Sequence, residues 1–228
     1  MPHKHKIKQY RVNGYYHAYN RGVEKRVVFN DDQDYRVFLH LLKFYLSPPP
    51  ADNKHPFSDR KIVSLIRPRP LANLHKEVDL LAYCLMPNHF HLLLQQKPID
   101  GMQKLMRRLL TTYAMYFNRR NNRVGYLFQG SYKAVLVDSD EYLLHLSRYI
   151  HLNPSELTRT VLVSDYPYSS YQYYLRKKKA GWLKQDIILD YFKSGKKFPL
   201  YTKYRSYEKY VDEYFEVAES SVGMLTID

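Results

Sequence analysis

Residues 80–96 read LLAYCLMPNHFHLLLQQ, and the fold depends on this stretch. It is apolar on both sides of the polar centre His89-Phe90-His91, and Pro87-Asn88 divides it. Pro and Asn favour turns, so the stretch predicts two buried strands joined by a turn or bulge. Residues i and i+2 of a strand project to the same face, so His89 and His91 point the same way. Two adjacent imidazoles suit a divalent metal, but they could instead cap a strand end through hydrogen bonds to the backbone.

The composition indicates a folded protein with a polyanionic partner. The chain has 228 residues, of which 45% are hydrophobic, which suits one large domain or one domain with an appendage. Lys and Arg number 36 against 22 Asp and Glu, a net charge of +14 that favours nucleic acid. The 24 Tyr offer flat faces for base stacking, which argues against a membrane surface as the partner.

Targeting signals and cysteine content favour a cytoplasmic protein. No run approaches the roughly 18 apolar residues of a membrane span. The basic start of the chain, residues 1–11, has no apolar segment after it, so we expect no secretion signal. Cys84 is the single cysteine and cannot form an internal disulfide, as is usual in a reducing compartment.

The order of predicted elements favours an α+β fold. We expect an antiparallel sheet with helices mainly on one face, in a ferredoxin-like split βαβ arrangement. A helix opens at Asp31-Asp32, and another, capped by Ser139 or Asp138, closes at Asn153-Pro154. The expected strands are 15–19, the two in 80–96, and one or two in 126–137 that break at Gly130; the expected helices begin at Asp31 and after Gly101, and span 141–152, 186–192 and 204–218.

The predicted domain division places residues 1–163 in one domain and 164–228 in a Tyr- and Lys-rich, partly helical appendage. A segment rich in Pro, Lys and Arg, about 47–76, interrupts the first domain as a long loop insertion.

A second motif, LLHLSRYIHLNP at residues 143–154, lies on the predicted helix 141–152. Residues four apart share a helix face, so Tyr149 lies beside Asn153 at the helix end, with His145 one turn earlier. If this helix packs over the two histidines, Asn153 could complete a metal site and Tyr149 would face the metal's ligand. The alternative is that Tyr149 is a half-buried aromatic residue and Asn153 a helix cap before Pro154.

The ordered motifs MPNHFHLLL and RYIHLNP, separated by a basic helix and YLFQGSYKAVLV, resemble the single-tyrosine HUH transposases of the IS200-like superfamily. The resemblance is strongest to the REP-associated tyrosine transposases. It covers about residues 15–154 and includes HAYNRGV at 17–23 as the opening strand. It implies that His89, His91 and Asn153 are metal ligands and that Tyr149 is the nucleophile. Related transposases can have Gln where this chain has the shorter Asn153.

The resemblance implies a DNA transposase or endonuclease that binds single-stranded DNA hairpins such as REP hairpins. Cleavage and rejoining would proceed through a 5′-phosphotyrosine and a free 3′-OH, assisted by Mg²⁺ or Mn²⁺. His145 is one candidate for the general base, although packing or solvent exposure also accounts for it. Two other functions remain open: a non-catalytic hairpin-binding protein, and a metal-dependent phosphoesterase in which water attacks. Tyr113 and Tyr116 are rival nucleophiles, but neither precedes a candidate ligand by one turn.

The basic residues of the long helix and its end are candidate phosphate ligands, although a solvated helix face would show the same pattern. Arg21 could contact a base edge or a phosphate, or serve only in a turn. Tyr126, Phe128 and Tyr132 could stack on unpaired bases or belong to the core. We expect a monomer in preference to a homodimer. The predicted DNA contacts are Arg21, Arg107, Arg108, Arg119, Arg120, Arg123, Lys133 and the basic arm at Lys4, Lys6 and Lys8.

Overall fold

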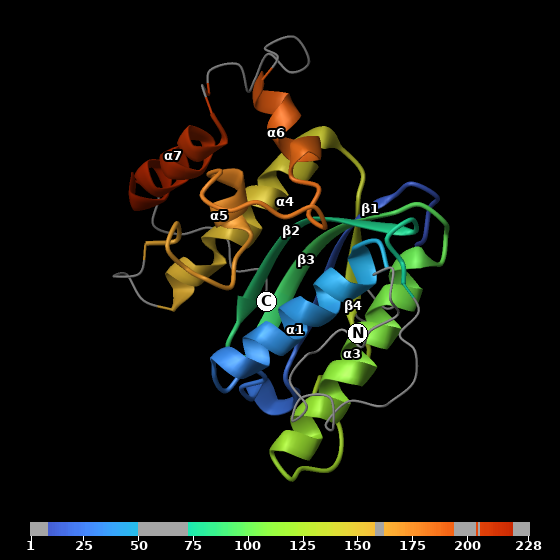
Figure 1. The fold of residues 1–228 in the computed structure, drawn as a ribbon. Helices are drawn as coiled ribbons and strands as arrows, with labels where there is room; N and C mark the ends of the chain where they lie inside the picture. Colours follow the sequence, from blue (N-terminus) through green and yellow to red (C-terminus); the bar gives the residue numbers. More distant parts are fainter. Residues whose placement is uncertain (1–8, 50–72, 158–161, 194–203, 205, 221–228) are drawn as a thin grey trace, which may run out of the picture.

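A four-stranded antiparallel sheet forms the centre of the structure, a computed structural model that describes residues 9–49, 73–157, 162–193, 204 and 206–220 (Figure 1). The strand order is β2-β3-β1-β4. The strands are β1 (Tyr15–Arg21), β2 (Val78–Met86), β3 (His89–Gln96) and β4 (Lys133–Val137). β2 and β3 form the hairpin expected from residues 80–96, and Pro87 and Asn88 lie in its turn.

Two helices, α1 (Asp32–Leu46) and α3 (Gly101–Arg120), pack against one face of this sheet and against each other (Figure 1). Asp31 caps α1 by accepting a hydrogen bond from the backbone N–H of Asp34. Phe38, Phe90 and Tyr113, from α1, β3 and α3, meet in the core between the layers. α1 connects β1 to β2, and α3 connects β3 to β4, so the predicted split βαβ arrangement is confirmed.

The opposite face of the sheet is covered by α4 (Asp140–Leu152) and η2 (Asn153–Glu156). Ser139 caps α4 by accepting a hydrogen bond from the N–H of Tyr142, as predicted. Every residue of β2 is buried, and because its side chains alternate between faces, both faces must be covered. The α+β class is therefore confirmed, but helices cover both faces of the sheet and not mainly one.

The chain after residue 164 packs beside α4 and along the outer edge of β2. It contains α5 (Tyr171–Tyr174), α6 (Asp186–Lys193) and α7 (Tyr207–Ser220), which gather near α4 in Figure 1. Ser170 donates a hydrogen bond to the carbonyl of Tyr83, and Leu183 forms a parallel bridge with Leu80. Tyr168 stacks on Tyr35 at 3.6 Å between ring centroids. The division of the chain at residues 163 and 164 stays a prediction.

One local expectation differs from the structure. In 126–137 only β4 is a strand, and Phe128 makes a single bridge to Gly22 instead of a second strand. The helix expected at 141–152 ends at Leu152 with Asn153 as its C-cap, as predicted, and the chain continues as η2, whose first turn tolerates Pro154 because it needs no N–H donor there. The predicted basic arm, apart from residues 9–11, and most of the predicted insertion lie outside the described residues.

Candidate active site

His89, His91, Tyr149 and Asn153 come together between the start of β3 and the end of α4. The Nε2 atom of His89 lies 3.4 Å from Oδ1 of Asn153. The rings of His89 and His91 are 5.0 Å apart, and the His91 ring is 5.6 Å from that of Tyr149, both in edge-on geometry. Residues from two distant motifs of the sequence therefore meet in one cluster, as the packing of α4 over the histidines predicted.

Two asparagines fix the hydrogen-bonding state of His89. Asn88 donates through Nδ2 to the carbonyl of Lys25, which turns its Oδ1 toward Nδ1 of His89 at 2.6 Å. Asn153 donates through Nδ2 to the carbonyl of Tyr149, which turns its Oδ1 toward Nε2 of His89. A neutral imidazole has one N–H, and the shorter contact to Asn88 takes it. The Nε2 lone pair and the Asn153 oxygen are then two acceptors that face each other.

This pair of acceptors fits a divalent cation. Neighbouring ligands of an octahedral ion with bonds of about 2.1 Å lie roughly 3 Å apart, close to the separation of these two atoms. His91 adds a second imidazole beside them. The described residues contain no group of three or more His, Cys, Asp or Glu that could hold a metal.

Burial keeps both histidines neutral. It lowers the pKa of His89, the contact with the Asn153 oxygen opposes this shift, and the Arg21 charge adds a smaller lowering contribution. Burial also places the pKa of His91 well below its usual value, and the neighbouring His17 and His89 lower it further. Because neutral imidazole is the metal-binding form, protons compete little for these nitrogens at neutral pH.

Tyr149 is half-buried, and burial raises the pKa of its phenol. The largest opposing cause is its hydrogen bond with Asn153, which lowers the pKa. A positive charge beside the phenol would be needed to favour the phenolate at neutral pH.

His17 belongs to the cluster although the motif analysis did not select it as a site residue. Its Nε2 lies 2.8 Å from Nδ1 of His91, and the two rings stack at 5.0 Å. Tyr19 lies 4.7 Å from His17 and 5.8 Å from His91 between ring centroids, so the three rings form one cluster. His17 and Tyr19 alternate along β1 as His89 and His91 do along β3, and that spacing was the available signal.

Two predicted cationic residues lie next to this cluster. Arg21 pairs with His89 in the antiparallel register, and its Nε is buried without a hydrogen-bond partner. The Nζ of Lys133, which is exposed, is 5.7 Å from the ring centroid of Tyr19. A buried N–H without a partner is uncommon and is a feature of groups that await a ligand.

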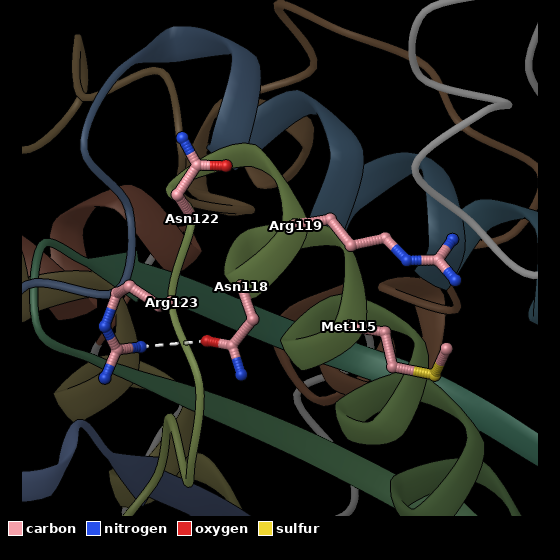
Figure 2. A pocket seen from close by; sticks show the side chains of 5 residues that line it. All are labelled: Met115, Asn118, Arg119, Asn122 and Arg123. Atoms are coloured by element: carbon pink, nitrogen blue, oxygen red, sulfur yellow. Dashed lines mark hydrogen bonds between the residues drawn. The ribbon is translucent and has the colours of Figure 1, made fainter.

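The C-terminal end of α3 carries a second basic region. Arg119 and Arg123, with Met115, Asn118 and Asn122, line a shallow hollow of about 450 Å³ (Figure 2). Arg123 donates to Oδ1 of Asn118 at 2.9 Å, and Figure 2 shows Arg119 extending away from them.

Arg120, which was expected among the DNA contacts, pairs instead with Asp31 and the buried Asp34. Its charge is neutralised within the fold, because it links the ends of α1 and α3. Arg107 is exposed and Arg108 is half-buried, both nearer the start of α3.

The rival catalytic residues occupy structural positions. Tyr113 and Tyr116 are fully buried in α3, where Tyr113 donates to the carbonyl of Val28 and Tyr116 donates to Asp34. His145 contacts Arg148 at 3.1 Å and faces the ring of Tyr210 in α7. The tyrosines whose rings lie beside His91 are Tyr149, at 5.6 Å, and Tyr19, at 5.8 Å.

Comparison with known proteins points to the same family as the motifs. The family model described as "Transposase IS200 like" matches residues 71–153. Among curated proteins no match is found. A solved structure described as "Structure of the REP associates tyrosine transposase bound to a REP hairpin" aligns with a TM-score of 0.50 at 16% identity. The alignment covers 75% of this chain and 84% of that chain.

No helix in the described part of the chain has the length and apolarity needed to cross a membrane. The family model begins just before β2 and ends at Asn153, so it spans both histidines and Tyr149. The resemblance expected from the motifs is thus confirmed: residues 71–153 carry the pattern of the IS200-like transposase family, on the fold seen in a REP-associated tyrosine transposase.

Proposed function

We propose that the protein binds single-stranded DNA with a hairpin and cleaves and rejoins one phosphodiester through a covalent bond to Tyr149. The main observation in support of this proposal is that His89 Nε2 and Asn153 Oδ1 face each other beside this tyrosine. The family match over residues 71–153 supports a transposase, and the hairpin is suggested by the ligand of the similar structure. We further propose that it acts as a monomer in the cytoplasm.

Tyr149 is proposed to attack phosphorus with its phenol oxygen. The Oη–P bond forms as the bond from phosphorus to the 3′ oxygen breaks, and the phenol proton is lost as the leaving oxygen gains one. The resemblance implies this polarity, which leaves a 5′-phosphotyrosine and a 3′-OH. Attack by a 3′-OH on the phosphotyrosine reverses the step and rejoins the strand, so the bond energy is conserved between the two steps.

His89, His91 and Asn153 are proposed to hold Mg²⁺ or Mn²⁺. The cation would supply positive charge to the phosphate oxygens and favour the phenolate. Two imidazoles in the donor set favour Mn²⁺ over Mg²⁺. Arg21 is proposed to donate its buried, unpartnered Nε–H to a phosphate oxygen at the same site.

A path for the DNA strand is proposed from this site around the end of the sheet. The loop 121–132 leads from the end of α3 to β4, and Gln129 donates to the carbonyl of Arg21 beside the histidines. The loop ends at Lys133, and the hollow of Arg119 and Arg123 lies at its start (Figure 2). Positive side chains therefore flank the loop at both ends.

Tyr126 is proposed to stack on an unpaired base along this path. The structure buries Phe128 and Tyr132 in the core but leaves Tyr126 86% exposed and Val124 93% exposed. Asn118 donates to the carbonyl of Gly125, which holds the tip of the loop to α3. An aromatic side chain presented from an anchored loop among arginines is suited to base stacking.

The test is incubation of the protein with a single-stranded hairpin DNA and Mn²⁺, followed by a denaturing gel. We expect a slowly migrating protein–DNA adduct with the native protein and no adduct with Tyr149→Phe, which should still shift the hairpin on a native gel. Cleavage without an adduct would indicate attack by water. Hairpin binding without cleavage would indicate a non-catalytic binding protein. An adduct that persists in Tyr149→Phe would assign the nucleophile to another tyrosine.

A further inference from the structure

His17 and His91 share a single proton between two ring nitrogens. They lie on neighbouring strands, β1 and β3, and project to the same face of the sheet. Nε2 of His17 is 2.8 Å from Nδ1 of His91, a hydrogen-bond distance. Both side chains are buried, at 6% and 7% exposure, so water cannot replace either partner readily.

The direction of this hydrogen bond decides whether His91 can bind a metal. If His17 donates, Nδ1 of His91 is the acceptor and a neutral His91 carries its proton on Nε2. That proton would occupy the one ring nitrogen that is not engaged by His17. If His91 donates from Nδ1, its Nε2 keeps a free lone pair. A metal-binding His91 therefore requires His17 to be the acceptor, with the His17 proton on its own Nδ1.

The surroundings hold His17 in place for this role. Its ring lies beside those of Tyr19 and His91, at 4.7 and 5.0 Å between centroids, and these two rings are themselves 5.8 Å apart. The edge of its ring also meets the ring of Tyr149 at 6.2 Å. The main chain of His17 is paired on both sides, with Leu93 of β3 and Val135 of β4. The acceptor nitrogen is therefore fixed by the sheet and by the aromatic stack.

We propose that His17 is a positioning residue that accepts a hydrogen bond from Nδ1 of His91 and so directs Nε2 of His91 toward the metal. The inference rests on the proposed metal site but adds a residue outside the two motifs that carry it. Metal-bound histidines commonly donate their second N–H to such an acceptor, and loss of the acceptor typically weakens metal binding 10- to 100-fold.

Two variants separate the hydrogen bond from packing. His17→Leu keeps an apolar volume but cannot accept, whereas His17→Gln offers an amide oxygen as a replacement acceptor. Free Mn²⁺ measured by electron paramagnetic resonance gives the affinity without any need for activity. We expect binding to weaken about 10- to 100-fold in His17→Leu and to recover largely in His17→Gln. Equal affinity of native protein and His17→Leu would overturn the proposal while leaving the metal site intact.

The tautomer itself gives an independent test that does not need a variant to fold. ¹⁵N NMR of the native, metal-free protein distinguishes a protonated from an unprotonated ring nitrogen. We expect His91 to be protonated on Nδ1 and His17 to be unprotonated on Nε2. Protonation of His91 on Nε2 would overturn the proposal. If neither the native protein nor His89→Ala binds Mn²⁺, the proposed metal site does not exist. His17 then has no role in positioning a metal ligand.

Discussion

Tyr116 donates its hydroxyl to Asp34, a carboxylate that is fully buried and also pairs with Arg120. Tyr149 in contrast is half-buried and lies edge-on to His91. The two tyrosines therefore lie in different settings. Tyr116 supports a buried ion pair, whereas Tyr149 lies edge-on to the imidazole of His91.

The two phenylalanine substitutions should produce opposite effects. Tyr116→Phe removes a hydrogen bond to a charged group and should lower the free energy of unfolding by about 1.5–3 kcal/mol, with the DNA adduct retained. Tyr149→Phe should abolish the adduct and change stability by less than about 1 kcal/mol. Urea denaturation and the denaturing gel measure the two effects. Loss of the adduct in a folded Tyr116→Phe protein would contradict this assignment.

The sequence predicted the residues of the cluster that local spacing controls. Alternation along a strand placed His89 and His91 on one face, and the helical repeat placed Tyr149 beside Asn153. His17 was missed because its role depends on β1 pairing with β3, and strand register is not contained in a local pattern. Asn88 was assigned only to the turn, because its contact with His89 depends on the side-chain conformation.

At the scale of elements, the loop 121–132 is the segment that local patterns described least well. Alternating Tyr126, Phe128 and Tyr132 predicted a strand, but Gly125 and Gly130 both have positive φ and the chain turns there. Phe128 makes one bridge and the rest of the loop is held by individual hydrogen bonds. The outcome is an exposed Tyr126 instead of a regular face of aromatic side chains.

Tyr126 should therefore contribute to the binding of unpaired bases. Tyr126→Ala removes a stacking interaction worth about 1–3 kcal/mol per base, which corresponds to roughly 5- to 150-fold weaker binding. Tyr126→Phe keeps the ring and should bind normally. The measurement is a titration with hairpin DNA carrying 2-aminopurine in its unpaired flank, whose fluorescence is quenched by stacking. Unchanged quenching in Tyr126→Ala would show that the base lies elsewhere.

The arginines at the end of α3 should determine part of the salt dependence of binding. For single-stranded DNA, the slope of log affinity against log salt is about 0.7 per phosphate neutralised. The double change of Arg119 and Arg123 to Ala should flatten the slope by about 1.4, measured by fluorescence anisotropy over a range of NaCl concentrations. Arg36→Ala is the control for the loss of one positive charge elsewhere, because Arg36 is exposed on α1 and paired with Asp32. If Arg36→Ala alone flattens the slope of log affinity against log salt by about 0.7, half the change expected for the double variant, the attraction is spread over the whole surface.

At the scale of the whole molecule, buried histidines on the α4 side of the sheet link β1, α4 and the C-terminal segment. Burial lowers the pKa of His17 to about 3 and that of His151 to about 3. His151 is 2.7 Å from the hydroxyls of both Ser170 and Tyr207, and so joins α4 to the start of α5 and to α7. This interior link to the C-terminal segment was not predicted from the sequence, because it needs three regions that are distant in the chain.

These pKa shifts make the fold sensitive to mild acid. The unfolded chain takes up a proton on each histidine as the pH falls below about 6.5, whereas the folded protein does not until about pH 3. Stability is therefore complete above about pH 6.5 and is lost as the pH falls toward 3. Between pH 7.5 and 5.5 each of these histidines should cost about 1.4 kcal/mol of the free energy of unfolding.

Urea denaturation at pH 7.5 and 5.5 measures this loss, which should reach about 3 kcal/mol for His17 and His151 together. His151→Gln isolates one contribution, because an amide can still donate and accept at Ser170 and Tyr207 but does not titrate. The loss between the two pH values should then shrink by about 1.4 kcal/mol. A loss that is the same in His151→Gln and in the native protein would mean that His151 binds its proton in the folded state. The buried link between α4 and α7 would then be a charged contact and not a neutral one.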